Sequence, residues 1–336
     1  MSALDSLANR LALQLELPDH VVYGVAEAAY KVFQYPLHIF VTSLHQIAPQ
    51  LVEHVDSFTA ANIHPFAKKL PLMTPSYVLF AVLAYYSFLV VLYPVGKVMS
   101  VPKIVGLVHN LFLFGLSLYM VVTIMVTARS AGFSLWNNGV GNGPHDWRLA
   151  KLIWLFYVSK IPEFGDTFIM MMKKNYHQIS FLHLYHHSTI FVIWFLTTLI
   201  APGGEAYWSA MVNSGVHVFM YGYYFGTMIC GETSVVRKFL NSIKFIITKG
   251  QMTQFAANCV QSVYDLSVVH PNYHTGLIKI LFWYMLTLLA LFANFLMRNN
   301  KKGKSGVKRV SDPSAKTSPS PTQVQKNKQP VKGKKL

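Results

Sequence analysis

The sequence predicts an all-α membrane protein that crosses the bilayer several times. Of its 336 residues, 53% are hydrophobic and only 12% are charged, whereas a soluble domain carries about 25% charged residues. Two long runs have no formal charge: 27 residues separate Lys69 from Lys97, and 25 separate Lys103 from Arg129. A helix needs about 20 apolar residues to cross the hydrocarbon core, so each run is long enough for one span.

Seven transmembrane helices account best for the apolar segments and the loop charges. The predicted spans are 75–95, 104–128, 149–172, 177–200, 207–229, 237–262 and 277–297. The first 56 residues hold six acidic and two basic residues, and the tail after the last span is rich in lysine. Because basic segments favour the cytosol, an odd number of spans places the N-terminus in the lumen and the C-terminus in the cytosol. The mixed charges of the 129–148 loop make it the weakest step in this alternation.

Three regions follow from these spans. We expect 1–70 to be a lumenal segment with one or two amphipathic helices over 20–56, 71–298 to be the membrane domain, and 299–336 to be a disordered cytosolic tail. From Arg298 onward there are 12 Lys or Arg and a single acid, so +11 of the net charge of +16 belongs to the tail. This location indicates contact with an anionic membrane surface and not with nucleic acid. Lys332 and Lys334 are placed as in a dilysine retrieval signal.

The strongest functional signal is a histidine cluster in the fourth span. His183, His186 and His187 stand at i, i+3 and i+4, so they share one helical face. Ionisable side chains inside a span are costly and usually functional, which makes this face a candidate site. Gln178 precedes the cluster on the cytosolic side.

Three further spans carry polar residues at depths that converge on this face, which predicts one buried chamber open toward the cytosol. By span, they are Lys160, Glu163 and Asp166 (third), Asn213, His217, Tyr221, Tyr223 and Tyr224 (fifth), and Lys249, Gln251 and Gln254 (sixth). The three charges of the third span form one polar face, either as an ion-paired packing device or as support for a histidine. The last two tyrosines also fit an interfacial aromatic belt. Lys249 is a partner for a substrate phosphate or carboxylate, or for an acid of the third span.

Two kinds of chemistry fit a histidine box in a membrane. Membrane desaturases and hydroxylases hold two irons with about eight histidines from three boxes, but this chain has one box and otherwise scattered histidines. Acyl transfer is the alternative, because a neutral imidazole is both a nucleophile and a base near pH 7. Attack on a thioester gives an acyl-imidazole, and decarboxylation of malonyl-CoA supplies a carbanion that attacks the acyl group. Neighbouring amide or histidine donors then stabilise the developing enolate.

Four motifs in order resemble the ELO family of very-long-chain fatty-acid elongases, the 3-ketoacyl-CoA synthases of the endoplasmic reticulum. They are KxxEFxDT (Lys160, Glu163, Phe164, Asp166, Thr167), HxxHH (His183, His186, His187), HxxMYxYY (His217, Met220, Tyr221, Tyr223, Tyr224) and TxxQxxQF (Thr248, Gln251, Gln254, Phe255). The resemblance covers about 70–300. It implies an inverted barrel of seven helices around a closed acyl tunnel and a ping-pong condensation that uses no metal or other cofactor.

The resemblance also implies roles for single residues. His186 would be the nucleophile that accepts the acyl group, and His217 its partner that activates or positions malonyl-CoA. The spacing from Gln178 to His183, with Tyr185, is similar to that of family members acting on polyunsaturated chains. The expected partners are acyl-CoA, malonyl-CoA and the lipid bilayer, with a homodimer and other enzymes of the elongation cycle as further candidates.

Overall fold

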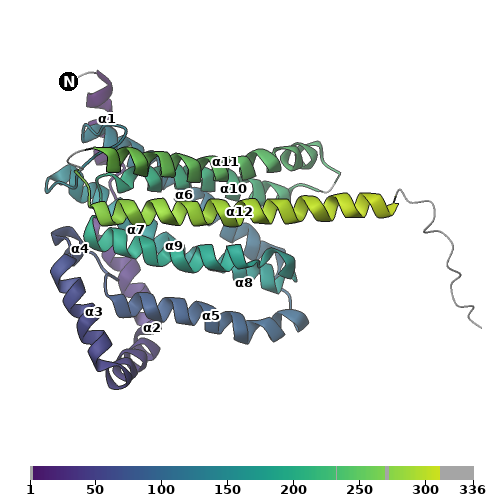
Figure 1. Ribbon diagram of the computed structural model, residues 1–336, viewed down its shortest axis with the longest axis horizontal. Coiled ribbons are helices and arrows are strands. Elements are labelled where there is room, and N and C mark those ends of the chain that lie inside the picture. The colour runs from purple at the N-terminus through teal and green to yellow at the C-terminus, as the bar shows by residue number, and fades with distance from the viewer. Residues whose placement is uncertain (1–2, 232, 269–271, 311–336) are drawn as a thin grey trace, which may run out of the picture. The chain divides into compact units, whose positions relative to one another are not determined.

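The computed structural model describes residues 3–231, 233–268 and 272–310, and every regular element within these ranges is a helix (Figure 1). The chain divides into two units, Met1–Phe292 and Ala293–Leu336, and the features below belong to the first. Four helices begin with proline in the first turn, where the missing N–H has no intrahelical partner to lose. They are α3 (Pro49–Asn62), α4 (Pro65–Lys69), α5 (Pro75–Val98) and α7 (Pro144–Glu163).

Among the described residues, three helices are long and apolar enough to cross a bilayer. They are α5, α6 (Lys103–Ser130) and the Thr275–Met297 part of α12 (Thr275–Val310), which match the first, second and seventh predicted spans. The other four predicted spans fall on α7 with α8 (Gly165–Met172), on α9 (Phe181–Ile200), on α10 (Ala206–Ile229) and on α11 (Val235–Ser267). These helices carry the polar side chains of the candidate site, which lower their hydropathy. The number of seven spans and the barrel around a tunnel stay predictions.

The third predicted span is interrupted after Glu163. There α7 ends, Phe164 forms a turn, and α8 begins at Gly165. Pro162 and Gly165 flank this turn, and both residue types weaken a continuous helix. The break corrects the prediction of one polar face, because it places Lys160 and Glu163 on one helix and Asp166 on the next.

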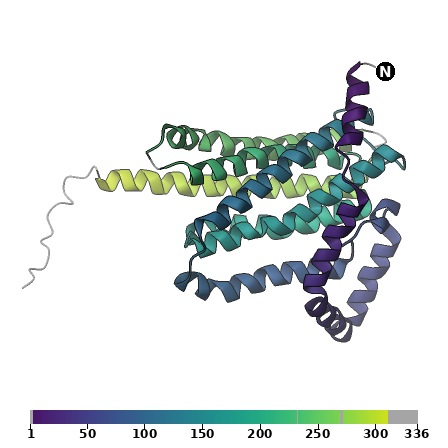
Figure 2. The same ribbon diagram turned by 180° about the vertical axis from the view of Figure 1, so that it is seen from behind.

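The helices of the first unit form a bundle that the N-terminal helices cross. Figures 1 and 2 show α5, α9, α10, α11 and the first part of α12 running in roughly one direction, and in Figure 2 α6 crosses them obliquely. The helix α10 packs on both α6 and α11. By contrast, α2 (Asp19–Ile47) and α3 run across one end of this bundle. Lys151, which is buried in α7, ties the segment before α2 down through Glu16 at 2.7 Å and Asp19 at 2.9 Å. A further helix, α1 (Ala3–Gln14), was not predicted.

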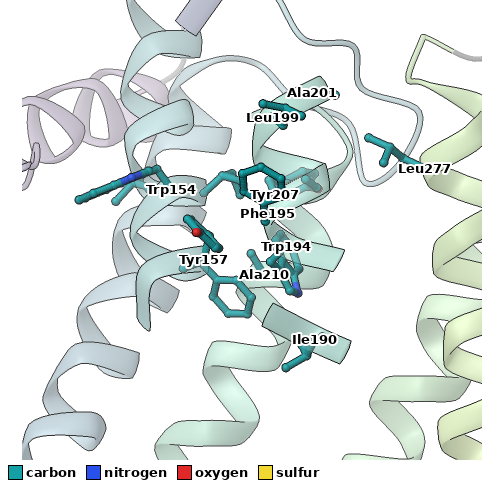
Figure 3. Packing of buried hydrophobic residues seen from close by; sticks show 14 of the residues in the cluster. Trp154, Tyr157, Ile190, Trp194, Phe195, Leu199, Ala201, Tyr207, Ala210 and Leu277 are labelled. Atoms are coloured by element: carbon teal, nitrogen blue, oxygen red, sulfur yellow. The ribbon is translucent and has the colours of Figure 1, made fainter. Parts of the chain in front are cut away.

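An aromatic core joins α7 to α9 beside the candidate site (Figure 3). The ring of Tyr157 stacks on Phe191 with 5.1 Å between centres, and Phe156 meets the edge of Trp194 at 4.4 Å. Trp154 donates its indole N–H to the carbonyl oxygen of Pro71 at 2.8 Å. Such large buried rings contribute packing and fix the relative rotation of the two helices.

The C-terminal region differs from the prediction at its start. The last helix continues to Val310, past the boundary at 299 expected for a disordered tail. No proline follows within the helix before Pro313, and Gly303 and Gly306 lower helix propensity without removing a backbone hydrogen-bond donor, so the helix can extend. Residues 311–336, including Lys332 and Lys334, lie outside the described part of the chain.

Candidate active site

The three histidines of the HxxHH motif form one cluster on α9. Ser180 caps this helix by accepting a hydrogen bond from the backbone N–H of His183 at 3.2 Å. The ring centres of His183 and His187 are 4.3 Å apart, and those of His186 and His187 are 5.7 Å apart. His187 is buried and the other two are partly buried. One turn of helix therefore brings three imidazoles into contact inside the protein.

A chain of hydrogen bonds from α8 and α5 holds His183. The Nε2 atom of His183 lies 2.7 Å from Oγ1 of Thr167, which lies 2.9 Å from the hydroxyl of Tyr85. Thr167 and Tyr85 are both buried, and the Tyr85 ring stacks on Phe164 at 4.4 Å. This arrangement restricts the rotation of the His183 ring.

His186 faces a different neighbour and a cavity. Its Nδ1 atom lies 3.2 Å from the hydroxyl of Tyr284 on α12, to which Thr189 donates at 3.1 Å. His186 lines a narrow cavity of about 50 Å³ together with Asn213 and Gln254. The Oδ1 atom of Asn213 is buried and has no hydrogen-bond partner within the described residues. Because buried polar atoms are normally paired, this atom is a candidate contact for a bound substrate.

A buried ion pair stands next to the histidine cluster. Lys160 donates to Oε1 of Glu163 at 2.7 Å, and Nδ1 of His217 lies 3.5 Å from the same oxygen. Lys160 and Glu163 are only 1% and 3% exposed, so this pair is removed from solvent. The ion pair itself lies within α7, and the contact of Glu163 with His217 joins α7 to α10, so the same carboxylate both connects two helices and supports a histidine.

The carboxylate of Asp166 forms a second polar cluster. Its Oδ2 atom accepts a hydrogen bond from the hydroxyl of Tyr221 at 2.8 Å, and its Oδ1 atom lies 2.8 Å from Nε2 of His109 on α6. A side chain at Gly165 would bring Cβ to 2.8 Å from the His109 ring, so only glycine allows this close approach. Three helices therefore meet at one carboxylate.

The remaining predicted site residues lie outside these clusters. Lys249 is exposed and stands over the Phe245 ring at 4.6 Å, so no pairing with an acid of the third span is observed among the described residues. Gln251 contacts the sulfur of Met220 at 3.7 Å. Gln178 is exposed in the short helix η1 (Tyr176–Gln178), and Tyr224 is 40% exposed beside a partly buried Tyr223.

Three residues of the site were not predicted: His109, Tyr85 and Tyr284. Each lies in a long apolar helix, and His109 is one of the scattered histidines outside the histidine box. A signal for His109 was available, because it is the single histidine of an otherwise uncharged span of 25 residues. The tyrosines carried no such signal, since tyrosine is common in apolar helices.

The far end of the His186 cavity is polar. There Glu205 accepts hydrogen bonds from the backbone N–H of Asn138 at 2.8 Å and from the side chain of Gln261 at 2.6 Å. Asp265 accepts from the backbone N–H of Asn137 at 3.1 Å. Burial, with the Glu205 carboxylate nearby, raises the pKa of Asp265 to about 7. These contacts pin the loop between α6 and α7 over the cavity end.

Basic residues gather at the opposite end of the bundle, where α6 begins and α8 ends. Burial, together with neighbouring Lys103, lowers the pKa of Lys173. An ammonium group with a second lysine in its neighbourhood favours the binding of an anion. Lys97 and Lys174 are exposed at the same end.

The described residues include possible metal ligands, and their arrangement is informative. Within 3–231, 233–268 and 272–310, no three His, Cys, Asp or Glu side chains come together as ligands of one metal ion would. That the site works without metal stays a prediction.

The apolar helices and the histidine cluster between them indicate the class of this protein. It is an integral membrane enzyme whose polar site lies between helices. The model of the ELO family, described as GNS1/SUR4, matches residues 70–308, and the chain belongs to this family. It is 51% identical over 299 residues to fatty acid elongase 6 of Leishmania major, which covers 88% of this chain and 78% of that protein. The shared sequence therefore extends beyond the family domain.

More distant relatives point the same way. Very long chain fatty acid elongase 5 of Rattus norvegicus is 37% identical over 203 residues, and that of Homo sapiens is 36% identical over 203 residues. In both, the match covers 59% of this chain and 65% of the relative. These findings favour a fatty-acid elongase over a histidine-box oxygenase.

Proposed function

We propose that this protein condenses a long-chain acyl-CoA with malonyl-CoA to give a 3-ketoacyl-CoA, CO₂ and CoA. The supporting observation is the position of His186, which lines a narrow cavity with Asn213 and Gln254 and lies in the histidine cluster beside the Lys160–Glu163 pair. Membership of the elongase family agrees with this activity.

In the first half-reaction, an imidazole nitrogen of His186 attacks the thioester carbon. If Nδ1 carries the proton and donates it to the hydroxyl of Tyr284, the lone pair of Nε2 is free to attack. The C–S bond breaks, CoA leaves as the thiolate and takes up the Nδ1 proton, and the acyl group stays on Nε2 of the now neutral imidazole. We therefore assign to Tyr284 the role of accepting this hydrogen bond and holding the reactive tautomer.

In the second half-reaction, malonyl-CoA loses CO₂ and its C2 carbon attacks the acyl-imidazole. The C–N bond breaks and releases the 3-ketoacyl-CoA, and the departing imidazole takes one proton from solvent, which restores the neutral His186. Before that, the electron pair left by decarboxylation resides on the thioester oxygen as an enolate, which needs hydrogen-bond donors. We assign this role to His217, oriented by Glu163, and to the side-chain amide of Asn213.

The cavity supports a chain-binding role. It extends along α9 from His186 to Thr197, a distance of about 16 Å at ~1.5 Å per residue. A zigzag of ~1.5 Å bonds advances about 1.25 Å per carbon, so this length matches about 13 extended carbons. The open volume of about 50 Å³ holds only about two of them, by comparison with a dry cavity of about 150 Å³ that holds benzene. Because the cavity is narrow, an acyl chain must displace apolar lining side chains. Cis double bonds shorten a chain of given carbon number, which favours the polyunsaturated substrates that we propose.

The basic end of the bundle supports CoA binding from one side of the membrane. The Lys103 and Lys173 ammonium groups provide positive charge for CoA phosphates. We infer that this side is the cytosol of the endoplasmic reticulum, that the N-terminus is lumenal, and that a homodimer or other elongation enzymes associate with the chain. No metal or other cofactor takes part in the proposed reaction.

The test uses the full chain in lipid nanodiscs with an acyl-CoA and labelled malonyl-CoA. Wild type should form labelled 3-ketoacyl-CoA with a chelator present, and His186→Ala should form none. The control is His45→Ala, because His45 is exposed and contacts only its own helix through the carbonyl of Val41. Product from His186→Ala at the wild-type rate would refute the assignment of the nucleophile.

Two further outcomes test the finer claims. A trapped acyl group on His186, found by mass spectrometry when malonyl-CoA is omitted, is expected for the two-step mechanism. A panel of saturated and polyunsaturated acyl-CoAs of equal carbon number tests the substrate preference. Faster turnover of the saturated chains would contradict the polyunsaturated assignment and leave the condensation intact.

A further inference from the structure

A second cavity lies outside the histidine site, between the N-terminal segment and the bundle. It has a volume of about 440 Å³ and is lined by residues of α2, α5, α7 and α8, with Phe191 of α9. No charged side chain lines it, and none of the candidate catalytic histidines does, although Tyr85, which contacts Thr167 of the histidine site, is part of the lining. Ligand sites in proteins typically measure about 300–1,000 Å³ and are mostly apolar, so this cavity has the dimensions of a binding site.

The dimensions fit one long hydrocarbon chain. Along α5 the lining runs from Tyr77 to Leu92, which spans about 22 Å at ~1.5 Å per residue. That length holds about 18 extended carbons at ~1.25 Å per carbon. The volume also indicates about 18 carbons. A dry cavity of about 150 Å³ holds the six carbons of benzene, and this cavity has about three times that volume.

One end of the cavity lies beside α2 and the other is near a cation. At the first end α2 packs on α5, where the Phe33 and Phe40 rings lie 6.3 Å and 5.6 Å from the Phe80 ring. At the other end Met171 lines the cavity and approaches Gly96, the neighbour of Lys97. Lys97 is exposed and stands over the Tyr93 ring, with no carboxylate partner in the described part of the chain.

We propose that this cavity binds one tail of an anionic bilayer phospholipid, with the tail end under α2 and the phosphate beside Lys97. An empty apolar cavity of this size forfeits the dispersion contacts of its lining, and a tail from the surrounding bilayer restores them. An anionic headgroup adds attraction to the unpaired ammonium group.

Other occupants fit less well. A helix of a second copy is about 10 Å wide and needs several times this volume over the same length. Residues 311–336 of the chain itself are rich in Lys, Ser and Pro and cannot fill an apolar space. The acyl-CoA substrate is the remaining competitor, because Tyr85 lines this cavity and also contacts Thr167 of the histidine site.

Photolabelling of the full chain tests the proposal. The protein is reconstituted in phosphatidylcholine vesicles that carry phosphatidic acid with a diazirine in one stearoyl tail, and labelled peptides are mapped after illumination. We expect labels on Tyr77–Leu92 of α5 and on Ala29–Leu37 of α2. Excess unlabelled stearoyl phosphatidic acid should compete, whereas stearoyl-CoA should not.

Variants separate this site from general contact with lipid. Ala84→Trp fills the cavity and should lower labelling about ten-fold, equivalent to about 1.4 kcal/mol of binding free energy. Val90→Trp is the matched control, because Val90 is on the same helix, is 75% exposed and does not line the cavity. Lys97→Gln should reduce the preference for phosphatidic acid over phosphatidylcholine about five-fold.

Folding of the variants is checked by gel filtration, and Ala81→Leu with Ala84→Leu replaces a Trp variant that does not fold. Equal labelling of the cavity-filled and control variants would overturn the proposal. Competition by stearoyl-CoA in place of phosphatidic acid would overturn it as well, and would assign the cavity to substrate. Condensation activity is not the readout, so this result and the test of His186 are independent.

Discussion

Removal of one partner of the Lys160–Glu163 pair is the most informative perturbation of stability. Glu163→Ala leaves the Lys160 ammonium buried at 1% exposure without its carboxylate at 2.7 Å. Breaking a buried pair in this way costs about 3–5 kcal/mol, because the remaining charge is uncompensated. With an unfolding entropy of about 2.1 cal/mol/K per residue over roughly 300 residues, we expect the Tm to fall by about 5–8 °C.

Two further variants test whether the unpaired buried charge causes the loss of stability. Lys160→Met combined with Glu163→Gln removes both charges and should recover most of the lost Tm, since no unpaired ion remains. Glu27→Ala is the control, because Lys31 and Glu27 have the same N···O distance of 2.7 Å but are 68% and 66% exposed. The assay is tryptophan fluorescence during heating in detergent. A Tm of Glu163→Ala equal to that of Glu27→Ala would refute the view that desolvation of the pair decides its role.

Three other outcomes follow from the structure. Tyr284→Phe should lower kcat about five-fold with little change in KM, because one hydrogen bond of about 1 kcal/mol to the His186 imidazole is lost. A change confined to KM would argue against the role of Tyr284 in holding the reactive tautomer of His186. Gly165→Ala should destabilise the protein by about 1–3 kcal/mol, because the new Cβ would lie 2.8 Å from the His109 ring. Gly115→Ala is the control and should leave the Tm unchanged, because no atom of another helix in the described part of the chain lies within 4 Å of its Cβ position. Equal Tm values for the two variants would contradict this expectation. The pKa of Asp265 is raised to about 7 in the folded protein, so between about pH 4 and pH 7 the folded state holds a proton that the unfolded state has lost. The free energy of unfolding should therefore fall as the pH rises through this range, by at most about 1.4 kcal/mol per pH unit. Asp265→Asn should flatten that profile of Tm against pH, and an unchanged profile would show that another group titrates.

Spacing along one helix predicted local clusters well. The i, i+3, i+4 histidines lie together on α9, and Lys160 pairs with Glu163 three residues on. Both follow from the period of an α-helix, which places such neighbours about 5–6 Å apart at Cβ. Where the helix is interrupted at Phe164, the same logic failed, and Asp166 turned to a different set of partners.

Contacts between helices could not be predicted in this way. The acids of the third span were candidate partners for Lys249 of the sixth span. Lys249 is exposed, however, and Glu163 is paired with Lys160. His109, Tyr85 and Tyr284 contact the site from three helices that carried no motif. Their participation depends on helix rotation, which packing of large rings decides.

By itself, the sequence determined the class of the protein: apolar helices of membrane length, a histidine face, and four ordered motifs of the elongase family. These features are local in the chain, so composition and helical period suffice to read them. Only the tertiary structure decided which polar groups meet, that His186 opens into a cavity, and that α2 lines a second apolar space with α5. The reason is that a side chain's partner across helices is set by how two surfaces interlock, and no spacing within either helix contains that information.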